Sequence, residues 1–160
     1  MADIHIEDFC KDIAKILLQL FNSFPRPSNV YVADIAGDDN PDEFGLHSER
    51  HLACFGAMVW LADEGYIRYV DTIRQEGIDQ AVLTHRTLCL LSRVCSDRHL
   101  LNDNEYLEPA SPTESEQDIS LPAETILDRK THINIIRAAL ASGSSTRIYR
   151  VIQRLVIQAC

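Results

Sequence analysis

The chain has 160 residues, of which 46% are hydrophobic and 24% charged, and these proportions are ordinary for a globular protein with one core. Its formal net charge is −9 at pH 7, so any binding to nucleic acid has to come from a local basic patch. No apolar run is long enough to cross a membrane, the polar start lacks the features of a secretory signal, and the five cysteines are scattered without a CxxC pair. We therefore expect a cytoplasmic protein with reduced thiols.

The charge is distributed unevenly along the chain. The first 103 residues carry 9 Lys/Arg and 17 Asp/Glu, whereas residues 122–160 carry 6 bases and 2 acids. The stretch between them is rich in Pro, Ser, Asn and Glu and has no periodicity, which is typical of a linker. We therefore predict three parts: a domain over residues 1–101, an acidic linker over 102–120 and a helical extension over 121–160.

The sequence up to Gly65 predicts two helices with a short β-like run between them. Apolar residues recur at helical spacing over 6–24. The run NVYVADI (Asn29–Ile35) fits either a strand or the start of a helix, and DDNPDEFG (Asp38–Gly45) predicts a loop. Ser48 can cap the next helix, which Gly65 ends. Its predicted core stripe is Leu52, Phe55, Val59 and Ala62, with His51 and Met58 at one edge.

A β-hairpin follows this helix. The β-like runs Tyr66–Arg74 and Gln80–Thr84 flank the five-residue connection Gln75–Asp79. Thr84 can cap a helix that continues to about residue 101. Two further helices are predicted, one from Pro122 to about Ala141 and one over Ser145–Ala159.

This order of elements resembles the winged-helix superfamily, in the style of MarR- and PadR-type bacterial regulators. The motif WLADEGYIRY (Trp60–Tyr69) is similar to the end of a recognition helix passing into the first wing strand. The motif AVLTHRTLCLL (Ala81–Leu91) is similar to the second wing strand returning into a helix. The resemblance covers about residues 6–100. It implies a mainly α fold with a small β wing, namely a winged helix-turn-helix core plus C-terminal amphipathic helices.

The resemblance implies a transcriptional regulator that binds double-stranded DNA. Ser48 and Arg50 would read or clamp the major groove, and Arg68 and Arg74 would hold phosphate from the wing. The expected DNA contacts are Ser48, Arg50, Ala53, Arg68 and Arg74. The alternative is an acidic winged-helix adaptor, with properties of a DNA mimic, that uses Trp60 against a basic protein.

The last predicted helix carries Arg147, Arg150 and Arg154 in one stripe beside an apolar face. The stripe fits contact with phosphate or an acidic partner, but pairing with the acidic body at the rim of a dimer helix is favoured. The resemblance implies that helices 6–24 and 122–159 form a homodimer interface. The expected protein-interface residues are Trp60, Ile148, Val151, Leu155, Arg147, Arg150 and Arg154.

Three patterns raise the question of a metal site. A calcium-loop pattern places Glu43 where the sharp turn needs glycine, so a solvated acidic loop is favoured. Two sets of His and Cys recur at helical spacing, but buried, satisfied side chains are favoured for both. The three sets are Asp38, Asn40, Asp42 and Glu49; His47, His51 and Cys54; and His85, Cys89, Cys95 and His99. We expect no metal, no cofactor and, because no catalytic motif is present, no enzyme.

Overall fold

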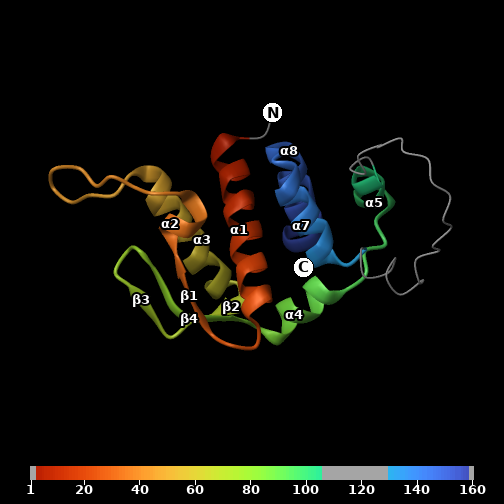
Figure 1. Cartoon of the computed structure of the whole chain (residues 1–160), viewed down its shortest axis with the longest axis horizontal. Coiled ribbons are helices and arrows are strands. Elements are labelled where there is room, and N and C mark those ends of the chain that lie inside the picture. Colours follow the sequence, from red (N-terminus) through yellow and green to blue (C-terminus); the bar gives the residue numbers. More distant parts are fainter. Residues whose placement is uncertain (1–2, 106–129, 159–160) are drawn as a thin grey trace, which may run out of the picture.

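A computed structural model describes residues 3–105 and 130–158 of the chain, with side chains up to residue 102 in the first range. Helix α1 (Ile4–Ser23) lies at the centre, with α7 and α8 on one side and α2, α3 and the sheet on the other (Figure 1). Its buried face repeats at helical spacing, and the predicted helix over 6–24 is confirmed with its start two residues earlier. The largest buried side chains of this face are Ile13, Ile16, Leu17 and Leu20.

The run NVYVADI, which fits strand or helix, contains both. Strand β1 (Ser28–Tyr31) is followed directly by the short helix α2 (Val32–Ala36), which ends where Gly37 adopts a φ of 96°. Residues 37–48 then form the loop predicted from Asp38–Gly45 and lead into α3.

Helix α3 (Glu49–Asp63) begins where predicted, because the Ser48 hydroxyl accepts a hydrogen bond from the backbone N–H of His51. Its buried stripe, however, is rotated by one residue, or about 100°, from the predicted one. Leu52 is 42% exposed, and the predicted stripe is wrong. The stripe that packs inward consists of His51, Cys54, Met58 and Leu61, with Ala57 beside it.

A small antiparallel sheet follows α3. Strands β2 (Ile67–Arg68) and β3 (Asp71–Ile73) both pair with β4 (Gly77–Leu83), and β4 also pairs with β1, giving the order β1-β4-β2. The predicted hairpin is confirmed, but its connection is shorter than predicted because Gly77 already pairs with Ile73. A side chain at Gly77 would collide with the carbonyl oxygen of Val30, so this glycine lets β1 and β4 come together rather than making a turn.

The single helix predicted from Thr84 to about residue 101 is divided in two. Thr84 caps α4 (His85–Ser92) as predicted, and α5 (Arg98–Glu105) takes up the first residues of the predicted linker. Between them, Val94 forms a β-bridge with Thr131, and the backbone N–H of Cys95 donates to the carbonyl of Lys130. Pairing with this distant segment interrupts the helix. The remainder of the linker and the start predicted at Pro122 lie outside the described residues.

Two helices close the described chain. Helix α7 (His132–Ser142) ends at Gly143, whose φ of 67° is left-handed, and α8 (Ser145–Ile152) continues into a π-helical turn (Gln153–Ile157). Both helices pack on α1 and share its hydrophobic core. In the described part of the chain, no helix is both long and apolar enough to cross a membrane.

The apolar face predicted for a dimer is covered within one chain. Ile148, Val151 and Leu155 are 2%, 2% and 5% exposed, because α8 packs along α1. Their assignment to a protein interface is therefore corrected. The two terminal amphipathic helices bury their faces against each other, so neither face requires a second copy.

Candidate functional site

The residues predicted to contact DNA are not equally available at the surface. Ala53 is exposed on α3, Arg68 is exposed on β2, and Arg74 is exposed in the turn between β3 and β4. Ser48 uses its hydroxyl to cap α3. The guanidinium of Arg50 makes its contacts with acids of the same chain.

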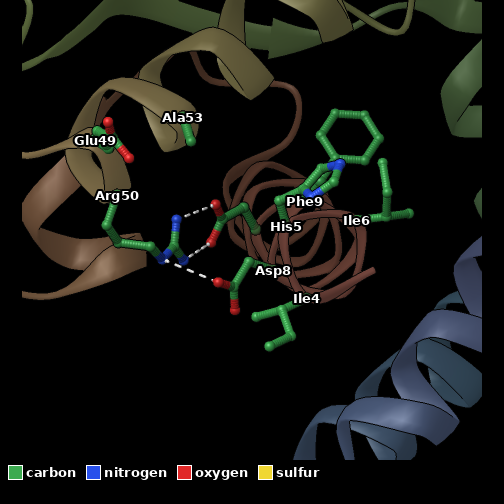
Figure 2. Close-up of a pocket in the computed structure, with 9 residues that line it drawn as sticks. Ile4, His5, Ile6, Asp8, Phe9, Glu49, Arg50 and Ala53 are labelled. Carbon is green, nitrogen blue, oxygen red and sulfur yellow. Dashed lines mark hydrogen bonds and ion pairs between the residues drawn. The ribbon is translucent and has the colours of Figure 1, made fainter. Parts of the chain in front are cut away.

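Arg50 points from α3 toward α1, where two acids hold it (Figure 2). Its Nη1 and Nη2 donate to the two carboxylate oxygens of Asp12 at 2.7 and 2.6 Å, and its Nε lies 3.8 Å from a carboxylate oxygen of Asp8. The hydrogen bond with Asp12 is the main reason that the pKa of Arg50 is raised above its ordinary value. Because Asp12 is 1% exposed, removing Arg50 from it would leave a buried carboxylate unpaired.

The pairing of Asp12 does not follow from the sequence pattern, which places this residue on the polar face of α1. The sequence does contain a signal for it, since Asp8 and Asp12 stand four residues apart on one helix face. Two like charges at this spacing repel each other and favour a cation between them. Which cation supplies that charge depends on how α3 is rotated, and the sequence leaves that rotation open.

A pocket of about 670 Å³ lies between the N-terminal parts of α1 and α3. Ile4, Ile6 and Phe9 of α1 and Ala53 of α3 give it an apolar lining, and Asp8, Glu49 and the Arg50–Asp12 pair add polar groups (Figure 2). Ile4 is 79% exposed, so a large apolar side chain stands at the edge of this pocket. Sequence reasoning does not identify the pocket, because it forms only when two separate helices meet.

Trp60, predicted as an exposed protein contact, is half-buried beside this pocket. Its ring packs edge-on against Phe9 at a centroid distance of 5.1 Å and stacks on Tyr66 at 5.9 Å. Trp60 therefore supports the Phe9 wall of the pocket and presents only part of its surface to a partner.

Of the C-terminal arginines, Arg154 pairs with an acid of the same chain. Its Nη1 donates to a carboxylate oxygen of Asp97 at 2.5 Å, and this hydrogen bond is the main reason that the pKa of Asp97 is lowered. The favoured interpretation, pairing with the acidic body, is confirmed for this arginine. Pairing of Arg154 with Asp97 also holds the π-helical turn after α8 near the start of α5.

Few residues of the three possible metal-ligand sets lie close together. Within the described residues, the groups that meet are His47, His51 and Asp39, with their donor atoms all within 4.8 Å of one another. Asp39 belongs to none of the three predicted sets, and Cys54 turns into the core. Asp42 of the calcium pattern uses its Oδ1 to accept hydrogen bonds from the backbone N–H groups of Phe44 and Leu46, which closes a local turn.

His85 and Cys89 of the second set of His and Cys are neighbours on the exposed face of α4, with Sγ 3.5 Å from Nε2. Cys95 is buried and apart from this pair, where its Sγ faces the carbonyl of Asp97. The two cysteines of this set therefore lie apart, and the expected burial is found for Cys95 but not for Cys89, which is exposed.

No protein-family model, curated protein or solved structure matches this chain.

Proposed function

We propose that this chain is a winged-helix protein whose function is to bind another protein, through the pocket between α1 and α3. The proposal rests on the ion pairs of Arg50. Arg50 is the one arginine in the sequence of α3, which has no lysine, and its guanidinium is paired with Asp12 and Asp8. The exposed part of α3 then offers apolar, small and acidic side chains, which suit a protein partner better than a phosphate backbone.

The order of elements supports the winged-helix part of the proposal. Helix α3 leads through Gly65 directly into β2 and the hairpin, and β4 lies between β1 and β2. This connectivity is what the resemblance of Trp60–Tyr69 and Ala81–Leu91 implies.

The pocket favours an amphipathic helix with basic flanks as the partner segment. An apolar lining formed by two helices receives apolar side chains spaced along one face of a third helix. Asp8 and Glu49 stand at this pocket, and the chain carries a net charge of −9, so lysine or arginine beside the apolar anchors would be attracted.

The test is selection of short helical peptides of random sequence against the immobilised full-length protein. We expect enrichment of peptides with apolar anchors at helical spacing and flanking basic residues. An Ala53→Arg variant, which fills the pocket from α3, should lose this binding. The matched control is Ala141→Arg, a change from alanine to arginine on the exposed face of α7, and this variant should bind like the wild type. Equal binding of the selected peptides to Ala53→Arg would reject the proposal.

DNA binding is the second candidate, and the exposed arginines of the wing favour it. Arg68 and Arg74 both lie on the hairpin, near Asp71 and Glu76. We expect any such binding to be weak and salt-sensitive. Arg68→Ala should weaken binding to all duplexes alike and reduce the salt slope by about one unit. Absence of duplex binding by the wild type at low ionic strength would reject this candidate and leave the first unaffected.

A further inference from the structure

The residues Asp39, His47 and His51 form a cluster at the start of α3. Asp39 and His47 lie on the loop of residues 37–48, and His51 lies in the first turn of the helix. The Oδ2 atom of Asp39 is 3.0 Å from Nδ1 of His47 and 3.7 Å from Nδ1 of His51. Two imidazole nitrogens and one carboxylate oxygen therefore converge from two segments.

The hydrogen bonding of His51 leaves one ring nitrogen free inside the protein. Nε2 of His51 is 2.7 Å from the carbonyl oxygen of Gln75, and because a carbonyl only accepts, Nε2 carries the hydrogen. In the neutral ring, Nδ1 then bears a lone pair. It is buried without a hydrogen-bond partner, and the residue is 5% exposed. A buried lone pair facing a carboxylate is unfavourable unless something positive lies between them.

The same arrangement is typical of histidines that ligate metals. Such a histidine usually donates its second ring N–H to a backbone carbonyl or carboxylate, which fixes the tautomer and directs the other nitrogen at the metal. Here the carbonyl of Gln75, in the turn between β3 and β4, fulfils that role for His51.

The spacing of the donors fits a tetrahedral ion. Metal–ligand distances of about 2.0–2.1 Å place neighbouring donors about 3.3–3.4 Å apart. The two distances from Asp39, 3.0 and 3.7 Å, lie on either side of that value, and all three donor atoms lie within 4.8 Å of one another. Two nitrogens and one oxygen suit Zn²⁺ and similar transition metals and do not suit Ca²⁺, which prefers oxygen alone.

One side chain has to move for an ion to bind. The rings of His47 and His51 are stacked at 3.9 Å with an angle of 4° between their planes, so a single ion cannot lie in the plane of both. His51 is fixed by α3 and by Gln75. His47 lies on the loop with 17% of its side chain exposed. Its Nδ1 donates to Oδ2 of Asp39, because a carboxylate only accepts. Binding of an ion would therefore displace this hydrogen, and the ring would tilt to direct the freed Nδ1 lone pair at the ion.

We propose that Asp39, His47 and His51 bind a divalent transition metal ion of the Zn²⁺ class, with water as the fourth ligand. The ion would join the loop of residues 37–48 to α3, and through the hydrogen bond of His51 to the hairpin turn. This proposal does not depend on the partner proposed for the pocket.

The first experiment is titration of the metal-free full-length protein with Co²⁺, followed by absorption, and with Zn²⁺, followed by calorimetry. We expect the visible bands of tetrahedral Co²⁺ and one bound Zn²⁺ per chain. His47→Ala and Asp39→Asn should each weaken Zn²⁺ binding by at least about tenfold. These two positions are chosen because both lie on the loop and neither is part of the core.

The matched control is the double variant His85→Ala/Cys89→Ser. The His85 and Cys89 side chains lie close together on the surface and are also of ligand type, so this control separates the two locations. The proposal requires that the double variant binds like the wild type. It is overturned if the double variant loses the ion while His47→Ala keeps it, or if the wild type binds no Zn²⁺ at micromolar concentration.

A second readout observes His51 directly without substituting a buried residue. In nitrogen-15 spectra of the histidine rings, metal-free protein should show His51 protonated at Nε2 alone, and Zn²⁺ should shift its Nδ1 resonance. A hydrogen on Nδ1 that Zn²⁺ does not displace would overturn the proposal, because a proton would then bridge His51 and Asp39.

Discussion

Arg50 joins α3 to two acids of α1 that differ strongly in exposure. Asp12 is 1% exposed, whereas 43% of the Asp8 side chain is exposed. We expect Arg50→Ala to lower the free energy of unfolding by about 2–3 kcal/mol, because it leaves the Asp12 carboxylate buried without its cation, and the partial exposure of Arg50 reduces the cost expected for a fully buried pair. Urea denaturation measures this difference.

Asp8→Ala is the matched control for this ion pair. It removes the longer contact to the same guanidinium, and an exposed pair contributes less than about 1 kcal/mol. Equal losses of stability for Arg50→Ala and Asp8→Ala would contradict the role assigned to Asp12.

His132 makes the stability of the chain depend on pH. It is 8% exposed, and burial lowers its pKa below the ordinary value of 6.5, with the Arg93 charge acting in the same direction. The unfolded chain therefore takes up a proton at this residue more readily than the folded chain does. Its contribution to stability is present above pH 6.5 and is lost as the pH falls below that value.

We expect His132→Gln to lose less stability between neutral and mildly acidic pH than the wild type does. Thermal unfolding across that range measures the slope. The exposed His85→Gln variant serves as the control and should keep the wild-type slope. An unchanged slope in His132→Gln would show that other groups cause the pH dependence.

At the scale of elements, the β1–β4 pairing depends on the absence of a side chain at Gly77. A methyl group there would meet the Val30 carbonyl of β1, and backbone cannot move aside as a flexible side chain can. We expect Gly77→Ala to destabilise the protein by about 2–3 kcal/mol. Denaturant unfolding measures the change.

Gly56 provides a control with the same substitution. It lies in α3, with open space where a methyl group would project, so Gly56→Ala should stabilise the protein by about 0.5–1 kcal/mol through helix propensity. If both variants lost stability equally, the close approach of β1 and β4 would not be the cause.

An element can be predicted from the sequence when the residues that determine it lie close together along the chain. The cap at Ser48 and the hairpin follow from the sequence, because caps and strand patterns depend on neighbours along the chain. The predicted rotation of α3 is wrong, because Leu52, Phe55 and Val59 form as apolar a stripe as the one that packs inward. The observed rotation also brings Arg50 to Asp12 of α1, and no pattern within α3 contains that information.

The candidate sites show the same dependence on tertiary contacts. The spacing of His47 and His51 marks them as possible ligands, but no pattern indicates Asp39 as the third donor, because the folding of the loop brings it there. The interruption of the predicted helix at Val94 cannot be predicted from the sequence either, since its pairing partner Thr131 is distant along the chain.

At the scale of the whole molecule, the C-terminal helices complete the core. Tyr66, which lies between α3 and β2, donates its buried hydroxyl to the carbonyl of Val156 at 3.0 Å. We expect a chain truncated before Lys130 to lose cooperative unfolding, because α1 would expose the face that α7 and α8 cover. Circular dichroism during urea titration would show this, and a stable, cooperatively unfolding fragment would contradict it.

Tyr66→Phe provides a milder form of the same test. Loss of one buried hydrogen bond should cost about 1–2 kcal/mol without changing the fold. A cooperative transition should therefore persist in this variant and be absent from the truncated chain.

The packing of α1 against α8 also has a consequence during synthesis. Helix α1 ends at Ser23 and α8 begins at Ser145, so a ribosome releases the first helix long before its covering partner exists. Contacts so distant in sequence slow folding and leave apolar surface exposed in the meantime. We therefore expect the nascent chain to expose the apolar face of α1, the kind of surface that chaperones bind, until α8 has left the exit tunnel.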